Sequence, residues 1–172
     1  MGSGGKKNLR YRDAADERQY MLSGDYEVYE KVGEPIGAVT FHYHDFYELI
    51  YIMEGEFSSL IEDRAVRMRK GDFLLIDKNV MHKYHPTGKS MASSRRIILW
   101  ISDQMLRELA EGEPFLAECF WGEGPKLYHF PIYYEEILRG FLLKLAMSEI
   151  LEGVDTQSTG IRKVMDRGNL SL

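Results

Sequence analysis

The residue types best suited to chemistry are three histidines and one glutamate. His42 and His44 are one residue apart, Glu48 follows four residues after His44, and His82 comes after several segments punctuated by turn residues. On a β-strand, alternate side chains point to the same face, so an extended segment would place His42, His44 and Glu48 on one side. Together with His82 they would offer three imidazoles and one carboxylate. Such a set suits a divalent transition metal. Without a metal it would be a hydrogen-bonded polar cluster lining a pocket.

The spacing of these residues resembles the first motif of the cupin superfamily. That motif is a glycine, about five residues, His-x-His, three or four residues, a glutamate, six residues and a glycine. The chain has Gly37, His42, His44, Glu48 and Gly55, and departs from the motif by one residue in the first gap. The resemblance implies a β-barrel whose interior carries the histidines and the glutamate.

The second cupin motif is matched in its spacing but not in every residue. Gly71, Asp77, Asn79 and His82 keep the spacing. Asp77 replaces a proline, Asn79 replaces a glycine, and Pro86 stands where an asparagine is usual. Asparagine is tolerable at the glycine position because it accepts a positive φ better than most residues.

Longer stretches resemble the amino-terminal sensor half of AraC-type transcriptional regulators. The similarity runs from about Tyr26 to about Leu151, through HYHDFYELIYIMEGE, MRKGDFLLIDKNVMH and RRIILWISDQMLREL. The resemblance implies a domain that binds a small organic effector in its barrel and pairs with a second copy through helices. DNA would then be bound by a carboxy-terminal helix-turn-helix domain that this chain does not contain, with Leu170, Ser171 and Leu172 as the start of the entry to it.

The resemblance leaves the role of the histidine set open. Cupin enzymes usually keep such a set for iron, manganese, nickel or zinc. AraC-type sensors often retain the His-x-His pair without an ion. His42, His44, Glu48 and His82 are therefore candidates both for a metal site and for a metal-free effector site.

Length, charge and cysteine content limit the functional classes. The 172 residues, 44% of them apolar, favour one domain with a sizeable core. The 22 basic and 27 acidic residues give a net charge of −5 without a basic stripe, so we do not expect this chain alone to bind DNA specifically. Cys119 is the single cysteine, which is typical of a reducing cytoplasm. The polar first twenty residues do not resemble a signal peptide, and no apolar run reaches the length of about 18 residues that a membrane helix needs.

The hydrophobic period divides the chain into four parts. Residues 1–20 form a polar tail or arm, whose start has the composition of a cloning remnant. Residues 21–102 contain short alternating runs separated by turn residues, which predict a mainly β fold: a cupin-like double-stranded β-barrel, or jelly roll. Residues 103–152 predict a small helical part that mediates dimerisation, with Ser102 or Asp103 as the first N-cap. Residues 153–172 read as a linker.

The strongest helix is predicted over residues 132–152, and it carries two apolar stripes. One can pack against the barrel, and the other favours a dimer interface over a helix that is broadly buried in its own domain. The first stripe contains Tyr134, Ile137, Leu138, Phe141 and Leu145, and the second contains Leu143, Met147, Ile150 and Leu151.

Two further residues are candidates for effector binding. Trp100 and Arg96 share the parity of Ile98 on one alternating strand, so both would project into the barrel. Trp100 would stack on a sugar or an aromatic effector, and Arg96 would contact a carboxylate or a hydroxyl group. Their alternatives are an ordinary core tryptophan and a solvated arginine. His85 is predicted to lie in solvent, outside the site.

The function favoured by these features is effector sensing in the cytoplasm by a homodimeric regulator domain, with a small metabolite such as a sugar as ligand. The sequence contains no nucleophile elbow, no Cys-x-x-Cys pair and no phosphate-binding glycine loop. An enzyme would therefore depend on metal chemistry alone. The alternative function is a metal-dependent cupin oxygenase or isomerase that uses His42, His44, Glu48 and His82 for zinc, nickel, manganese or iron.

Overall fold

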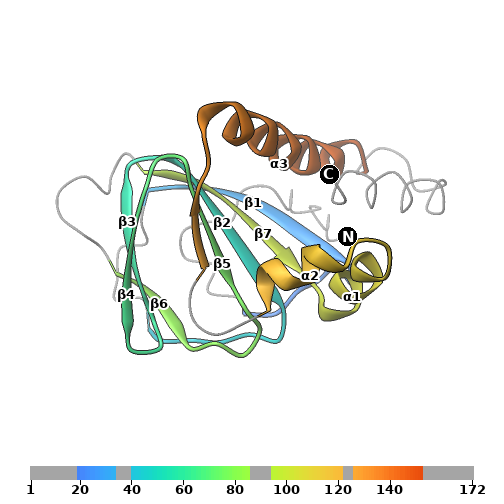
Figure 1. Cartoon of the computed structure of the whole chain (residues 1–172), viewed down its shortest axis with the longest axis horizontal. Helices are drawn as coiled ribbons and strands as arrows, with labels where there is room; N and C mark the ends of the chain where they lie inside the picture. Colours follow the sequence, from blue (N-terminus) through green and yellow to red (C-terminus); the bar gives the residue numbers. More distant parts are fainter. Residues whose placement is uncertain (1–18, 34–39, 86–93, 122–125, 153–172) are drawn as a thin grey trace, which may run out of the picture.

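The computed structural model describes residues 19–33, 40–85, 94–121 and 126–152. Two antiparallel sheets face each other, in the strand orders β1-β7-β2-β5-β8 and β4-β3-β6 (Figure 1). The predicted fold class is confirmed, because the described part of the chain is mainly β and its last element is a helix. The strands are β1 (Tyr26–Val32), β2 (Tyr47–Glu54), β3 (Glu56–Ile61), β4 (Arg64–Arg69), β5 (Asp72–Ile76), β6 (His82–His85), β7 (Arg95–Ile101) and β8 (Lys126–His129).

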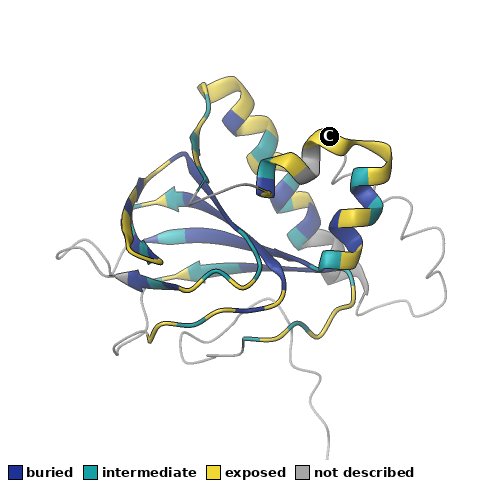
Figure 2. Cartoon of the chain, turned by 60° about the horizontal axis from the view of Figure 1, so that its bottom comes forward, coloured by how far each residue is buried: buried dark blue, intermediate teal, exposed yellow. Residues whose placement is uncertain are grey.

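The space between the two sheets is filled by one cluster of buried side chains. The larger sheet contributes residues of even number from β2, β5 and β7, as period-2 alternation requires. The smaller sheet contributes side chains from β3, β4 and β6. The main members are Tyr29, Phe46, Ile50, Ile52, Phe57, Ile61, Met68, Leu74, Ile76, Tyr84, Ile98 and Trp100. Figure 2 shows the buried strands between exposed helical surfaces and loops.

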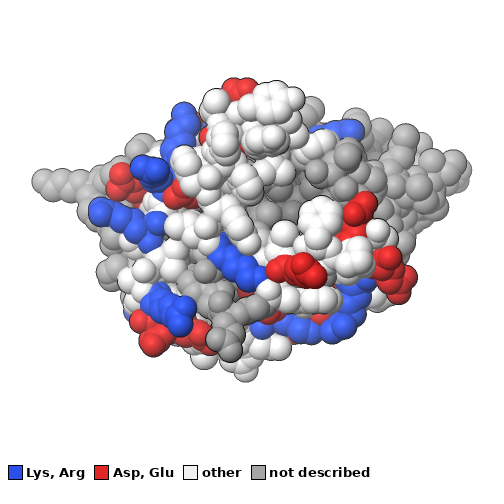
Figure 3. All heavy atoms as spheres, in the orientation of Figure 1, with Lys and Arg blue, Asp and Glu red and all other residues white. Residues whose placement is uncertain are grey.

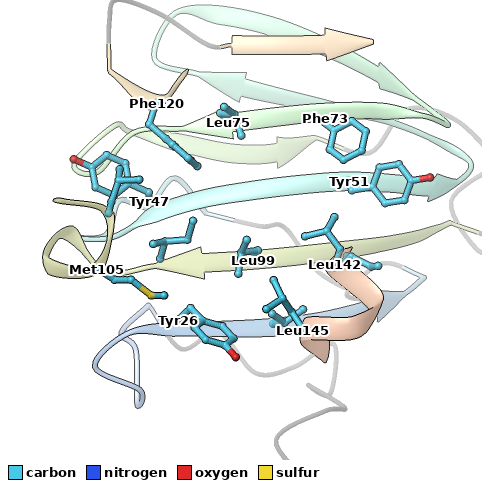
Figure 4. Close-up of a cluster of buried hydrophobic side chains, with 14 of the residues drawn as sticks. Tyr26, Tyr47, Tyr51, Phe73, Leu75, Leu99, Met105, Phe120, Leu142 and Leu145 are labelled. Carbon is cyan, nitrogen blue, oxygen red and sulfur yellow. The ribbon is translucent and has the colours of Figure 1, made fainter. Parts of the chain in front are cut away.

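A second cluster lies on the outer face of the larger sheet, under three helices. These are α1 (Asp103–Gly112), α2 (Pro114–Phe120) and α3 (Ile132–Glu152). Figure 4 shows side chains of the sheet meeting Met105 of α1, Phe120 of α2, and Leu142 and Leu145 of α3. The larger sheet is therefore buried on both faces. Ser102 is the N-cap of α1, since its hydroxyl accepts the Met105 N–H at 3.1 Å.

The packing of α3 differs from the stripe predicted for it. The bounds of the helix agree with the sequence, but Tyr134 and Ile137 are 57% and 40% exposed. The buried positions in the described part of α3 are Glu135, Leu142 and Leu145, of which Leu145 belongs to the predicted stripe. Leu138, four residues before Leu142, packs beside them.

The second predicted stripe of α3 is only partly visible. Leu143 packs against the protein's own outer cluster. The side chains of Met147, Ile150 and Leu151 lie outside the described residues. The residues 1–18 and 153–172, predicted as arm and linker, also lie outside the described part.

Strand β2 has a different neighbour on each face. Glu48, Ile50 and Ile52 face the other sheet, whereas Tyr47 and Tyr51 face the helices. The Tyr47 hydroxyl donates to Asp103 at the start of α1 (3.1 Å) and accepts the Trp121 indole N–H. The Tyr51 hydroxyl donates to the buried Glu135 of α3 at 2.7 Å.

Two turns, one before β5 and one before β6, require a positive φ. Asn79 has φ 62°, which confirms that asparagine can occupy the glycine position of the motif. Gly71 has φ 88°, and a Cβ there would lie 2.9 Å from Glu135 Oε2, so this glycine also makes room for α3.

One strand was not predicted. β8, of four residues, lies inside the segment 103–152 that was predicted as helical, and pairs with β5 at the edge of the larger sheet. Its exposure alternates along the strand, but over too few residues to give a clear sequence pattern. Of the helices in the described ranges, none combines the length and apolarity needed to span a bilayer.

Candidate functional site

The site lies in the barrel interior, where β2 and β6 face each other. His44, Glu48 and His82 are 4%, 3% and 0% exposed. Their potential ligand atoms all lie within 4.8 Å of one another. The distance from Glu48 Oε2 is 3.3 Å to His82 Nε2 and 3.7 Å to His44 Nε2. Among the residues that the structure describes, this is the group whose geometry suits a metal ion.

The backbone fixes the two buried imidazoles. His44 Nδ1 and His82 Nδ1 each lie 2.8 Å from a backbone carbonyl oxygen, of Phe46 and Val80 respectively. A carbonyl can only accept, so both Nδ1 atoms carry the hydrogen. When the rings are neutral, the Nε2 atoms therefore present lone pairs toward Glu48. Within the described part of the chain, neither Nε2 atom has a hydrogen-bond partner.

A positive charge between the two buried lone pairs and the carboxylate would stabilise this arrangement. A proton on an imidazole would supply it, and so would a metal ion. Tetrahedral ligands at about 2.1 Å from an ion lie about 3.4 Å apart, close to the 3.3 and 3.7 Å between Glu48 Oε2 and the two Nε2 atoms. The donor set of two imidazoles and one carboxylate therefore fits zinc, nickel, manganese or iron.

The electrostatics of Glu48 and His82 follow from their proximity. Burial by itself raises the pKa of Glu48, but His44 and His82 outweigh it and hold the pKa well below its usual range. Burial lowers the pKa of His82, yet the adjacent Glu48 outweighs this and raises the pKa above its ordinary value. Both shifts favour the charged forms of the pair.

His42 does not belong to the set of three. Its backbone pairs with His82 in both directions, at 3.0 and 2.9 Å, and the two ring centroids are 4.3 Å apart. Its Nδ1 donates to the Thr40 carbonyl oxygen at 3.1 Å, and the ring is half-buried. Burial lowers the pKa of His42, and the nearby His82 lowers it further. The expected extended segment through His42, His44 and Glu48 is interrupted, because β2 begins only at Tyr47.

The turn before β6 holds the His44 segment in place. The Asn79 N–H donates to the His44 carbonyl oxygen at 2.7 Å. The His44 side chain is held as well, because the Phe46 ring stacks on its imidazole with centroids 3.9 Å apart. His44 thus reaches the site through a bend rather than through strand alternation.

Trp100 and Arg96 both lie in the barrel interior, as their parity predicted. The Trp100 ring packs against Phe46 and Tyr29, with centroids 4.4 and 5.1 Å away, and its indole N–H donates to Glu48 Oε1 at 3.0 Å. Arg96 is 1% exposed, which excludes the solvated alternative.

The guanidinium group of Arg96 lies among aromatic rings. It is 4.5 Å from the Phe57 ring centroid and 5.6 Å from that of Tyr84, and Nη1 donates to the Gly33 carbonyl oxygen at 3.2 Å. The neighbouring Arg95 is on the opposite face of β7 and pairs with Glu30 and Glu54. The side chain of His85 lies outside the described residues.

Tyr84 belongs to the site although the sequence pattern did not single it out. Its hydroxyl donates to Glu48 Oε2 at 3.0 Å. Tyr84 is two residues after His82 on β6, so both point to the same face. That parity is the signal that would have identified it.

The comparisons with known proteins agree with this architecture. The family model of the AraC-like ligand binding domain matches residues 34–131, which is more than half of the chain. No curated protein matches the sequence.

Several solved structures are similar to the chain. An apo ToxT variant from Vibrio cholerae is 12% identical with a TM-score of 0.49, over 85% of this chain and 52% of that one. ToxT bound to (E)-4-(8-methylnaphthalen-1-yl)but-3-enoic acid is 15% identical with a TM-score of 0.44, over 84% and 54%. A cupin-2 domain protein from Shewanella frigidimarina is 21% identical with a TM-score of 0.37, over 54% and 84%.

These TM-scores lie below 0.5, so nothing about function rests on the solved structures. The chain spans about half the length of the ToxT structures that it matches. Membership rests on the family model, which covers every predicted site residue. The chain belongs to the family of AraC-like ligand-binding domains.

Proposed function

We propose that this chain is the effector-sensing and dimerisation domain of an AraC-type transcription regulator. A small metabolite, such as a sugar, binds inside the cupin barrel. The observation that carries this proposal is the coincidence of the family match with the interior polar groups. Residues 34–131 include His44, Glu48, His82 and Arg96, all buried between the two sheets. DNA contact belongs to a helix-turn-helix domain outside this chain, and the protein acts in the cytoplasm.

Arg96 is the residue best suited to recognise a polar effector. A guanidinium group presents several N–H donors in a fixed plane, which suits a carboxylate or a pair of hydroxyl groups. The aromatic rings of Phe57 and Tyr84 beside it support the flat face of the group. Trp100 contributes through its indole edge at Glu48.

Effector binding is tested with Arg96→Met and a control from the next residue. In calorimetric titrations with a panel of monosaccharides and small carboxylic acids, we expect the wild-type chain to bind at least one compound. Arg96→Met should weaken that binding at least tenfold, because methionine keeps the bulk but loses the donors. Arg95→Met removes an arginine from the opposite face and should bind like wild type. Equal binding by all three proteins would remove Arg96 from the site.

We further propose that the same interior binds a divalent metal. His44, Glu48 and His82 would hold it, since their ligand atoms converge and two of them have no hydrogen-bond partner in the described residues. The ion would supply a positive charge to which effector oxygen atoms can bind. His42 remains a candidate fourth ligand through its contact with His82.

Dimerisation is proposed through the start of α3. Ile132, Tyr133, Tyr134 and Ile137 are all at least 40% exposed there, and mainly uncharged side chains gather on this part of the surface (Figure 3). Exposed apolar groups of this kind often mark an interaction surface. The alternative is a monomer in which α3 only covers the sheet.

The dimer is tested with Tyr134→Glu and Ile137→Glu. We expect the wild-type chain to sediment as a dimer at micromolar concentration and both variants to shift toward monomer, because a charge would have to be buried. Gln104→Glu on the exposed side of α1 adds the same charge elsewhere and should leave the dimer intact. A wild-type monomer at high micromolar concentration would contradict the proposal.

A metal-dependent cupin enzyme is the second candidate. The observation that favours it is the pair of unpartnered Nε2 atoms at Glu48, which suits a catalytic metal as well as a regulatory one. An oxygenase or an isomerase would then use the ion for substrate binding. Elemental analysis of the purified chain shows whether a metal is bound, and mass spectrometry of a compound incubated with the chain separates the two functions, because a sensor leaves its ligand unchanged and an enzyme converts it.

A further inference from the structure

Glu48 is held at both of its oxygen atoms by side chains from different sheets. Trp100 Nε1 donates to Oε1 and the Tyr84 hydroxyl donates to Oε2, each at 3.0 Å. Trp100 lies on β7, directly opposite Glu48 in the larger sheet, and Tyr84 lies on β6 in the smaller sheet. The carboxylate is thus fixed across the barrel interior.

The two donors have different consequences for the carboxylate. The indole N–H occupies Oε1, which turns Oε2 toward the imidazoles of His44 and His82. The Tyr84 hydroxyl occupies one lone pair of Oε2 and leaves another for the space between the imidazoles. Both oxygen atoms of Glu48 therefore have a fixed hydrogen-bond donor inside the barrel, where the carboxylate is buried.

Both donor side chains are themselves fixed by packing. The Trp100 ring lies against Phe46 and Tyr29. The Tyr84 ring lies between the Arg96 guanidinium, at 5.6 Å, and the His82 ring, at 6.2 Å. Neither donor can therefore turn away from Glu48 without displacing several buried groups.

We propose that Tyr84 and Trp100 are positioning residues that prepare Glu48 to bind a divalent cation together with His44 and His82. This inference rests on the proposed metal site. Its physical basis is that groups hydrogen-bonded to a ligand orient it and preserve its charge, and their loss typically weakens metal affinity 10- to 100-fold. The two residues act through Glu48, without touching the ion.

The test compares two variants with a matched control. Tyr84→Phe and Trp100→Phe each remove one donor to Glu48. Tyr51→Phe also removes a buried tyrosine hydroxyl that donates to a carboxylate, but that carboxylate is Glu135 on the helical side of the same strand. The dissociation constant for Zn²⁺ is measured by competition with a chromophoric chelator, and the visible spectrum of the Co²⁺ form reports the ligand geometry.

We expect Tyr84→Phe and Trp100→Phe to bind Zn²⁺ 10- to 100-fold more weakly than wild type and to change the Co²⁺ spectrum. Tyr51→Phe should bind within twofold of wild type, whatever its melting temperature. Affinities of the two site variants within twofold of wild type would overturn the inference and leave the metal site intact. An equal loss in Tyr51→Phe would also overturn it, because general destabilisation would then be the cause.

A wild-type chain that binds neither Zn²⁺ nor Co²⁺ would overturn both this inference and the proposed metal site. The proposal of effector sensing would still stand, since the comparison of Arg96→Met with Arg95→Met tests it separately.

Discussion

Glu48→Gln should weaken Zn²⁺ binding by at least 100-fold while the apo protein stays folded. The amide keeps the shape of the carboxylate but removes its negative charge, the only one in the proposed ligand set of His44, Glu48 and His82. In the apo protein the amide N–H can donate to an unpartnered imidazole Nε2, and the Tyr84 hydroxyl can rotate to accept. We therefore expect the free energy of unfolding of the apo variant to stay within about 1 kcal/mol of wild type.

Urea denaturation with and without Zn²⁺ measures both effects. The wild-type chain should gain about 2.7 kcal/mol when free Zn²⁺ is 100 times its dissociation constant, and Glu48→Gln should gain almost nothing at that concentration. Glu135→Gln is the control, since Glu135 is also a buried glutamate with a tyrosine donor but belongs to α3, on the outer face of the larger sheet. The metal assignment would be wrong if Glu48→Gln and wild type gained equally.

Leu142→Ala and Leu145→Ala should each lower the free energy of unfolding by about 2–5 kcal/mol, the usual cost of truncating a buried leucine. Both side chains are at most 5% exposed and pack on the outer face of the larger sheet (Figure 4). Ile137→Ala on the same helix should change stability by about 0.5 kcal/mol or less in the monomer, because Ile137 is 40% exposed.

Denaturant midpoints measured at low protein concentration separate these outcomes from any effect on dimerisation. A large loss in Ile137→Ala together with a small one in Leu142→Ala would favour the helix face predicted from the sequence over the face seen in the structure.

Local sequence patterns were sufficient for most of the fold. Alternating apolar runs and turn residues predicted the β part, and one of the two predicted N-cap candidates, Ser102, caps α1. The bounds of α3 were also predicted, because apolar residues recur at helical spacing on both sides of Gly140. In each case the information lies within a few residues of the element that it defines.

The rotation of α3 about its axis could not be predicted in the same way. The helix is apolar on several sides, so more than one stripe satisfies helical spacing. The presence of Glu135 on the buried face depends on a hydroxyl that β2 contributes, Tyr51. Because Tyr51 is far from Glu135 in the sequence, a pattern read along the helix alone would place this carboxylate on the solvent face.

The candidate site shows the same division. Motif spacing identified His44, Glu48 and His82, which the structure brings together. It also grouped His42 with them; the three converging ligand atoms do not include one of His42, whose ring instead lies against that of His82. The hydrogen bond from Tyr84 to Glu48 joins residues 36 positions apart, on different sheets, and follows only from the facing of the sheets.

Because β2 makes specific hydrogen bonds on both of its faces, it also disfavours a shifted register against β7. If β2 slipped by one residue against β7, Tyr47 and Tyr51 would enter the space between the sheets and Glu48 would turn toward the helices. Asp103 and Glu135 would then lose their hydroxyl donors, and Trp100 would lose its acceptor. Slippage is thus penalised on both faces at once, so the residues that form the site also specify how the central strands align.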